Sequence, residues 1–241
     1  MKKIFFFLSI LLMANTLKAQ EETVVVKDNN AAQRPLSGSF TAITVSGAID
    51  IYLSQSNEEV LAVSASETKY RDRIVTEVVD GVLKIYYNDK GMQFSSGSKK
   101  LKAYISFKNI NSIKASGASD VYANGVIEVP VLKLVLSGSS DFKGAVNVGD
   151  LKLDQSGSSD SYISGRADKT TIDVSGASDV KGYDLEVDYC EANASGASDI
   201  QITVNKEITA SASGASDIYY KGSPAQKNIK SSGASSVSKR N

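Results

Sequence analysis

The sequence contains no histidine and no tryptophan, and it has only one cysteine among its 241 residues. Because histidine is the commonest general base and the commonest metal ligand, its absence excludes every Ser-His-Asp and Cys-His catalytic arrangement. The single thiol, Cys190, cannot form an intrachain disulfide, so burial and hydrogen bonding must stabilise the fold. We therefore expect no catalytic residues, no metal ligands and no cofactor.

Long apolar runs are also scarce. The one at residues 4–14 follows Lys2 and Lys3 and precedes Ala19, a pattern typical of a secretory signal peptide over residues 1–19. The run is about half the length that a bilayer span needs, so we expect an exported mature chain without a membrane span. Removal of residues 1–19 takes away three lysines and leaves 24 of the 27 basic residues against 27 acidic ones. This balance gives no electrostatic reason to bind nucleic acid.

A five-residue motif organises the second half of the chain. Copies of SGASD or SGSSD begin at Ser116, Ser137, Ser156, Ser175, Ser195 and Ser213, and a decayed copy, SGASS, begins at Ser232. Apolar and polar residues alternate before each copy, which is the period of a strand with one buried face. A unit of about 19 residues cannot bury that face alone and must stack on its neighbours. The repeat therefore predicts an all-β fold, a right-handed parallel β-solenoid over residues 116–241.

Residues 36–115 predict a different element, an N-terminal β-rich cap that protects the end of the solenoid. Asp80-Gly81 stands between two β-prone runs and is typical of a tight hairpin. Residues 20–35 are polar and patternless, which indicates a linker. A lone relative of the motif, SGAID, begins at Ser46. The expected strands cover residues 40–46, 49–54, 60–64, 74–79, 82–87 and 101–107, with one helical turn within 67–73.

Stacking the repeats predicts a column of aspartates and a column of glycines at one corner. The expected columns are Asp120, Asp141, Asp160, Asp179, Asp199 and Asp217, and Gly117, Gly138, Gly157, Gly176, Gly196 and Gly214. Carboxylates about 5 Å apart repel by roughly 1 kcal/mol in water, so the row needs compensation. We interpret it as a structural ladder, in which each Asp accepts backbone N–H groups and the serine hydroxyls form a ladder of their own. Calcium binding and a catalytic groove for polysaccharide cleavage are the alternatives.

Lysines and tyrosines bear on function. Lys143, Lys181 and Lys221 recur near the second corner, which is repetition and not the cluster of unlike residues that acid–base catalysis needs. Among the tyrosines, two adjacent pairs could offer rings to a sugar or a protein, although strand tyrosines commonly serve packing alone. These pairs are Tyr86 with Tyr87 and Tyr219 with Tyr220.

The opening of residues 36–115 carries a family likeness. The pattern Phe40-x-x-Ile43-x-Val45-Ser46-Gly47, then Asp50-Ile51-Tyr52-Leu53, the strand Asp80–Ile85 and the SGASD series resemble the putative auto-transporter adhesin, head GIN domain family. The resemblance runs from Ser39 to Val237 and makes residues 36–238 one domain. It implies a β-helical architecture, a cell-envelope location in Gram-negative bacteria and an adhesive or structural role without catalytic residues.

Two hypotheses from different classes follow. The first is a non-catalytic binding or scaffold protein, periplasmic or on the cell surface, that presents a rigid solenoid face to a protein or glycan. The second is a carbohydrate-active β-helix enzyme, either a polysaccharide lyase or a glycoside hydrolase. An enzyme would gather unlike Asp, Lys and Arg residues in one groove, whereas a scaffold would not require it.

Overall fold

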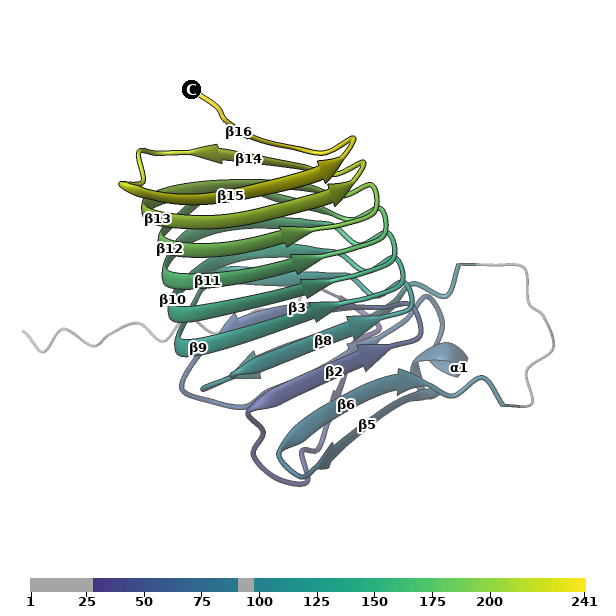
Figure 1. Ribbon diagram of the computed structural model, residues 1–241. Helices are drawn as coiled ribbons and strands as arrows, with labels where there is room; N and C mark the ends of the chain where they lie inside the picture. The colour runs from purple at the N-terminus through teal and green to yellow at the C-terminus, as the bar shows by residue number, and fades with distance from the viewer. Residues whose placement is uncertain (1–27, 91–97) are drawn as a thin grey trace, which may run out of the picture.

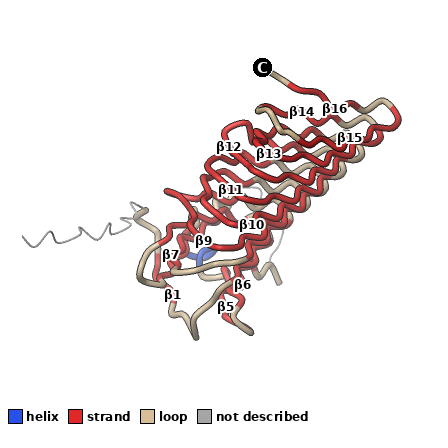
Figure 2. Tube along the Cα trace, turned by 60° about the vertical axis from the view of Figure 1, so that its left-hand side comes forward, coloured by secondary structure: helices blue, strands red, loops and turns tan. Residues whose placement is uncertain are grey.

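The fold is a β-solenoid of about seven coils of about 19 residues, closed at one end by a smaller mixed region (Figure 1). The computed structural model describes residues 28–90 and 98–241. The predicted signal peptide lies outside these residues. The expected all-β solenoid is confirmed, and successive coils lie side by side along the rod (Figure 2).

Two sheets face each other across the solenoid. The first contains β1 (Ala32–Arg34), β4 (Val60–Ser64), β7 (Leu101–Phe107) and β3 (Ile49–Gln55), then the N-terminal halves of β9 (Val121–Leu136), β10 (Phe142–Gln155), β11 (Ser161–Val174), β12 (Asp179–Ala194) and β13 (Asp199–Gly214), and ends with β14 (Asp217–Lys221) and β16 (Ser236–Lys239). The second contains β5 (Ile74–Val79), β6 (Val82–Tyr87), β2 (Ala42–Ser46) and β8 (Ser112–Ser116), then the C-terminal halves of β9 to β13, and β15 (Gln226–Gly233). One short helix, α1 (Thr68–Arg71), lies in the cap.

Each middle coil is one long bent strand and not the two or three short strands that its length suggests. Parallel pairing between β10 and β11 runs almost without interruption from Phe142↔Ser161 to Gln155↔Val174. The backbone hydrogen bonds therefore continue around the second corner, which we call the bend. The SGASD corner joins the second sheet to the first, and the bend joins the first sheet to the second within one strand.

The stack of corners begins earlier than residue 116. Strand β2 pairs with β8, and β3 pairs with β9, so the SGAID segment at Ser46 lies directly beneath the corner at Ser116. Residues 56–111 are inserted where the bend of this first coil would be. The insertion adds β7 beside β3 and β6 beside β2, and thereby covers the N-terminal end of both sheets.

The sequence-based expectations for the cap mostly agree with the structure. The hairpin of β5 and β6 turns at Asp80-Gly81, and both residues have the positive φ that such a turn requires. The expected linker is different: residues 32–34 form β1, which pairs antiparallel with β4. Three residues are too few to show a strand period, and the exposed edge of β4 supplies the partner.

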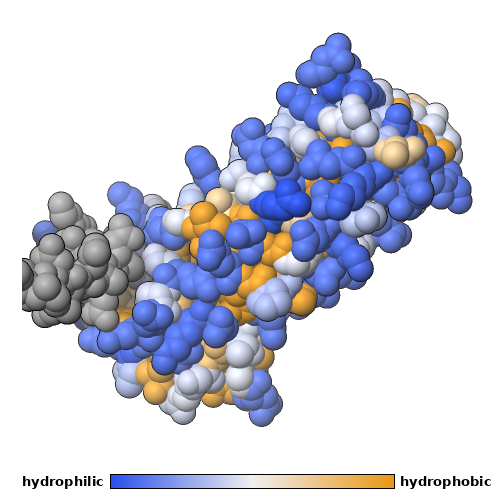
Figure 3. Space-filling view, turned by 90° about the vertical axis from the view of Figure 1, so that its left-hand side faces the viewer, coloured by the Kyte–Doolittle hydropathy of each residue, from blue (hydrophilic) through white to orange (hydrophobic). Residues whose placement is uncertain are grey.

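A side chain replaces a missing strand at the bend of β9. Residues 125–132 of β9 have no neighbouring strand on the cap side, because the chain leaves the coil at Gln55. The Gln55 amide donates to the carbonyl of Glu128 at 3.0 Å and accepts from its N–H at 2.7 Å. Seen from the side of the bends, the surface carries apolar areas among polar ones (Figure 3), and Val126 and Val131 of β9 are about half exposed.

One continuous apolar core fills the space between the sheets. Equivalent inward residues of successive coils stack in columns, one of which is Leu134, Leu153, Ile172, Ala192 and Ala210. The lone thiol, Cys190, is one of the core residues, and burial raises its pKa to about 12. Such a thiol is a small apolar filler and not a nucleophile.

Candidate functional site

The SGASD corners form a column in which glycine backbones touch. The six glycines of the expected column have φ between +79° and +84°. Each carbonyl accepts the N–H of the third motif residue in the next coil at 2.7–2.8 Å. A Cβ atom placed on any of the five glycines from Gly138 to Gly214 would lie 2.4–2.7 Å from the preceding glycine's carbonyl oxygen. Both the positive φ and the close approach therefore require glycine.

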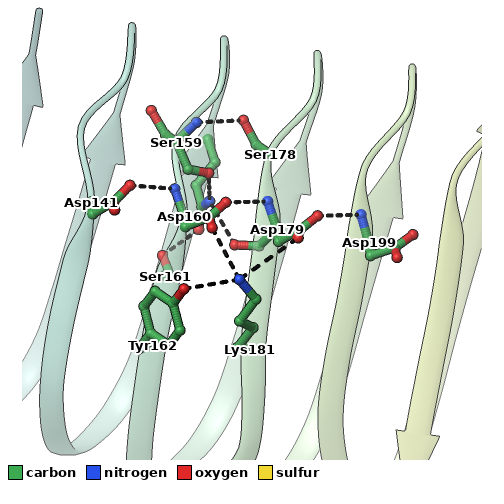
Figure 4. A network of polar contacts seen from close by, with 10 residues as sticks. Asp141, Ser159, Asp160, Ser161, Tyr162, Ser178, Asp179, Lys181 and Asp199 are labelled. Carbon is green, nitrogen blue, oxygen red and sulfur yellow. Dashed lines mark hydrogen bonds and ion pairs between the residues drawn. The ribbon is translucent and has the colours of Figure 1, made fainter. Parts of the chain in front are cut away.

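The aspartates stand in one row next to this column (Figure 4). In each step, the Oδ1 atom of one Asp accepts the backbone N–H of the Asp in the following coil, at 2.9–3.3 Å from Asp120 to Asp217. The row starts at Asp50, whose carboxylate accepts the Asp120 amide. It ends where Ser236 replaces the aspartate and donates both its N–H and its hydroxyl to Asp217. Every carboxylate of the row thus has a donor that offsets part of the repulsion.

The fourth motif residue forms a second row, which is fully buried. The Oγ atoms of Ser119, Ser140, Ser159, Ser178 and Ser198 accept backbone N–H groups of the preceding coil at 3.1–3.5 Å. The hydroxyls therefore bond to the backbone and not mainly to one another, unlike a simple hydroxyl ladder. The Asp row bonds toward the C-terminus and the serine row toward the N-terminus. Together they tie each corner to both neighbours.

The aspartates of the row differ in the sign of the pKa shift. Desolvation, together with the neighbouring carboxylates, raises the pKa of Asp141 and of Asp199 above 3.8. The hydroxyls of Ser236 and Tyr219 instead hold the pKa of Asp217 below 3.8. The C-terminal end of the row, Asp217, is thus stabilised as an anion, whereas Asp141, Asp199 and also Asp50 at the start of the row carry their charge at a cost.

This contrast predicts opposite effects of one substitution. A raised pKa means that the folded state binds the proton more tightly, so ionised Asp141 lowers stability at pH 7. Asp141→Asn keeps the acceptor for the Asp160 N–H and should raise the free energy of unfolding at pH 7 by less than about 1 kcal/mol, because the group is partly exposed. The gain should vanish as pH falls through about 4.

Asp217→Asn is the matched control. Its lowered pKa contributes stability above 3.8 that is lost on acidification, so this variant should be less stable than wild type at neutral pH. Urea denaturation at several pH values measures both. Equal shifts in the same direction would contradict the proposed difference between the middle and the end of the row.

A second column lies beside the Asp row on the outer face of the first sheet. In spatial order it consists of Tyr104, Tyr52, Tyr122, Lys143, Tyr162, Lys181, Gln201 and Tyr219. We call it the tyrosine–lysine column. The first three rings stack with centroids 5.2 and 5.1 Å apart. From Tyr122 onward each member stands two residues after a motif Asp, so both columns share one face.

A shallow groove of about 700 Å³ opens in the middle of this column. Tyr122, Tyr162, Lys181 and Tyr183 stand around it, and small residues such as Gly144 form its floor. Tyr183 belongs to a bulge, since the register between β12 and β13 shifts after Gly182 and resumes at Glu186. Bulges commonly re-aim side chains next to functional sites. The register also shifts between Lys143 and Ala145 and between Val187 and Tyr189, so this bulge is one of several irregularities in the repeat.

The groove holds one engaged lysine. Lys181 Nζ lies 3.0 Å from Asp160 Oδ2, 3.0 Å from the Tyr162 hydroxyl and 3.8 Å from Asp179 Oδ2 (Figure 4). It also stands 4.6 Å from the centre of the Tyr162 ring. These contacts raise the pKa of Lys181, with the Tyr162 hydrogen bond first among the causes, so this ammonium stays charged at neutral pH.

The next lysine of the column is different. Among residues 28–90 and 98–241, the ammonium of Lys143 has neither an ion-pair nor a hydrogen-bond partner. The neighbouring phenol of Tyr122 is protonated at neutral pH, because burial and the adjacent Asp120 raise its pKa to about 12. The groove therefore offers fixed donors and rings, with Lys181 held as a cation and Tyr122 as a neutral phenol.

Sequence reasoning located this column only in part. Tyr219 was singled out and belongs to it, whereas Tyr220 is buried in the core and Tyr86 lies in the cap. The expectation that the lysines are mere repetition is wrong: Lys181 joins unlike residues in one cluster, and Lys221 stands 4.7 Å over the Tyr183 ring. The usable signal was the second residue after each motif Asp, which is Tyr or Lys in five of the six complete motifs from Ser116 to Ser213.

The outer face of the second sheet has a smaller depression of about 400 Å³. Its acidic groups are already engaged, since Asp154 pairs with Lys133 at 3.1 Å and Asp173 accepts from Asn193 at 3.0 Å. Within the described part of the chain, no three His, Cys, Asp or Glu side chains are grouped so as to hold a metal ion. In the same residues, no helix has the length and apolarity that crossing a membrane requires.

Several solved structures resemble the chain in fold. The crystal structure of a putative adhesin from Bacteroides fragilis NCTC 9343 is 22% identical with a TM-score of 0.77, covering 88% of this chain and 98% of that one. A putative adhesin from Parabacteroides distasonis ATCC 8503 is 20% identical with a TM-score of 0.68, again covering 88% and 98%. A protein from the same strain, named putative lipid binding protein, is 23% identical with a TM-score of 0.62 and the same coverage. Identities this low show a shared fold alone.

Curated proteins give no match to the chain. A family model described as putative auto-transporter adhesin, head GIN domain, matches residues 39–224. These residues include the first stacked corner, the inserted cap, the glycine and aspartate columns and the groove. The chain therefore belongs to the putative auto-transporter adhesin, head GIN domain family.

Proposed function

We propose that this protein is a non-catalytic binding module of the bacterial cell envelope, which presents its tyrosine–lysine column to a glycan or protein. The observation that carries the proposal is the column itself: eight side chains, five of them tyrosines, in one row on one face. Tyrosine combines a large apolar ring with a polar tip and loses little entropy on binding, which suits it to recognition surfaces.

The corner ladders support such a role. Each coil is tied to its neighbours by the glycine, aspartate and serine rows, so the column is held without help from a ligand. A preorganised surface binds with a smaller loss of conformational entropy. We propose on the same grounds that the aspartate and glycine columns are structural, and that they act on the ligand only through oxygens left free at the groove.

Carbohydrate cleavage is the weaker candidate. The cluster of Lys181, Tyr162 and Asp160 does bring unlike groups into one groove. Catalysis by such a cluster needs one member that gains or loses a proton near neutral pH. The raised pKa of Lys181 keeps it cationic, and the high pKa of Tyr122 keeps its phenol protonated. Binding without turnover fits these charges better.

The family name and the sequence together support export. We propose that residues 1–19 are a signal peptide and that residues 36–238 act as a single unit in the periplasm or on the cell surface. The family is named for adhesion.

An array of extracellular proteins and polysaccharides, probed with the labelled protein, tests the proposal. We expect signals that fall in a Tyr122→Ala, Tyr162→Ala double variant and persist in Tyr189→Ala. Tyr189 is the matched control because it is 44% exposed, as is Tyr162, and has Lys206 at 5.5 Å from its ring centre, but lies on the other side of the solenoid. Unchanged binding by the double variant, or new reducing ends or unsaturated products after incubation with a polysaccharide, would overturn the proposal.

A further inference from the structure

We infer that the coil of β10 forms a saccharide subsite and that the ligand of the groove is a neutral, hydroxyl-rich glycan. This inference rests on the proposed function and names the ligand class of the same surface. Its basis is a difference between coils that otherwise repeat one another. Unlike the two flanking coils, the coil of β10 brings an unengaged carboxylate oxygen and an unengaged ammonium together on the column's face.

The acceptor is Asp141 Oδ2. Its Oδ1 atom is used by the Asp160 N–H at 2.9 Å, while Oδ2 receives no hydrogen bond from the described residues. In the flanking coils the equivalent oxygens are occupied: Asp120 Oδ2 by the Tyr122 hydroxyl at 3.2 Å and Asp160 Oδ2 by Lys181 at 3.0 Å. Asp141 thus offers an oxygen that is held in place by the ladder but free to accept.

The donor is the Lys143 ammonium, which lies two residues after Asp141 at the start of β10 and therefore on the same face. No ion pair joins it to Asp141, although both are described. Tyr122 and Tyr162 pair with Lys143 from the two neighbouring coils, so a ring flanks the subsite on either side. Tyr162 is 44% exposed, which leaves much of its surface for contact.

This donor and acceptor together favour a hydroxyl-bearing ligand. A hydroxyl group can donate to Asp141 and accept from Lys143, and two neighbouring hydroxyls of one sugar ring can do both at once. Successive coils are about 4.8 Å apart, which is close to the length of one sugar unit. A chain of sugars lying along the solenoid axis would therefore meet a new coil with each unit.

The charges around the subsite disfavour anionic glycans and basic peptides as ligands. A uronate-rich or sulfated glycan offers mainly acceptors and would meet the Asp row, where burial and the neighbouring carboxylates already raise the pKa of Asp141. A basic peptide would meet Lys143 and Lys181, and the rings of Tyr162 and Tyr219 already carry Lys181 and Arg240 at 4.6 and 4.3 Å. A neutral glycan is repelled neither by the Asp row nor by the lysines.

Affinity electrophoresis of the purified protein tests the inference with three sets of probes: neutral polysaccharides (xylan, mannan and mixed-linkage β-glucan), anionic ones (alginate and polygalacturonate), and polylysine. We expect retention by at least one neutral polysaccharide and none by the charged polymers. Asp141→Asn turns the free acceptor into an amide donor, because the amide oxygen stays with the Asp160 N–H. This variant and Lys143→Ala should each bind about tenfold more weakly.

The controls separate binding from folding. Asp199→Asn makes the same change in the same row and should leave retention unchanged, as should Tyr189→Ala. Asp141→Asn should bind less while unfolding at a higher urea concentration, a combination that a merely structural role does not produce. Retention by alginate, polygalacturonate or polylysine, no retention by any neutral polysaccharide, or equal loss in Asp141→Asn and Asp199→Asn would overturn the inference. The proposed function would then still stand if the Tyr122→Ala, Tyr162→Ala variant lost its array signals.

Discussion

Gly176→Ala should lower the free energy of unfolding by about 2–5 kcal/mol, one of the largest effects of any single methyl group in this chain. Gly176 has φ +84°, where an L-residue costs about 1–2 kcal/mol. Its new Cβ would also lie 2.5 Å from the carbonyl oxygen of Gly157, an atom fixed by its hydrogen bond to Ala177. Backbone shifts of this kind cost about 1–3 kcal/mol more. Urea denaturation followed by circular dichroism measures the loss.

Gly125→Ala separates the two contributions. Gly125 has φ +81°, nearly the same as Gly176, but nothing lies within 4 Å of the position its Cβ would take. It should therefore lose only the conformational part, about 1–2 kcal/mol. If both variants lost the same amount, contact between stacked glycines would not matter, and the column would be explained by turn conformation alone.

Gln155→Leu should destabilise the protein by about 2–4 kcal/mol although it makes the core more apolar. Gln155 occupies a column position held by Leu136 and Val174 in the adjacent coils, and it is only 3% exposed. Its amide donates to the Ser159 carbonyl at 2.7 Å and accepts the Ser161 hydroxyl. Without Gln155, that buried hydroxyl has no acceptor, and a buried polar group without a partner costs about 1–3 kcal/mol.

A second substitution should restore most of the loss. Ser161 stands where Phe142 and Val180 stand in the neighbouring coils, so Gln155→Leu with Ser161→Val returns this coil to the apolar pattern. Replacing both partners by apolar groups is commonly neutral or stabilising, and we expect the double variant within about 1 kcal/mol of wild type. A double-mutant cycle from urea denaturation gives the coupling. Additive losses would show that the two residues do not act as a pair.

The Gln155–Ser161 pair places two polar residues where the neighbouring coils have apolar ones. It joins the strands β10 and β11 through the hydrogen bond that the Ser161 hydroxyl donates to the Gln155 amide oxygen.

The groove was harder to foresee than the stack that carries it. The spacing of SGASD is local and repeats in the sequence, so the stacked corners, the hairpin at Asp80-Gly81 and the β-rich cap follow from patterns of a few residues. The groove depends on a bulge at Tyr183 and on which lysine finds a partner. Neither has a local signal, because Lys143 and Lys181 occupy equivalent motif positions and differ only in what the neighbouring coil presents.

The sequence alone determined that this chain is an all-β repeat without imidazole chemistry. The absence of histidine excludes imidazole, and the period of about 19 residues sets the repeat independently of tertiary contacts. The tertiary structure alone decided where the solenoid begins. Ser46 lies in the stack because the 56-residue insertion, residues 56–111, returns the chain to β8 and β9, which pair with β2 and β3. It also decided that the rings of Tyr52 and Tyr122 stack, and that Lys181 pairs with Asp160 while the Lys143 ammonium has no ion-pair or hydrogen-bond partner among the described residues. Contacts between residues distant in sequence set these outcomes, and no local pattern encodes them.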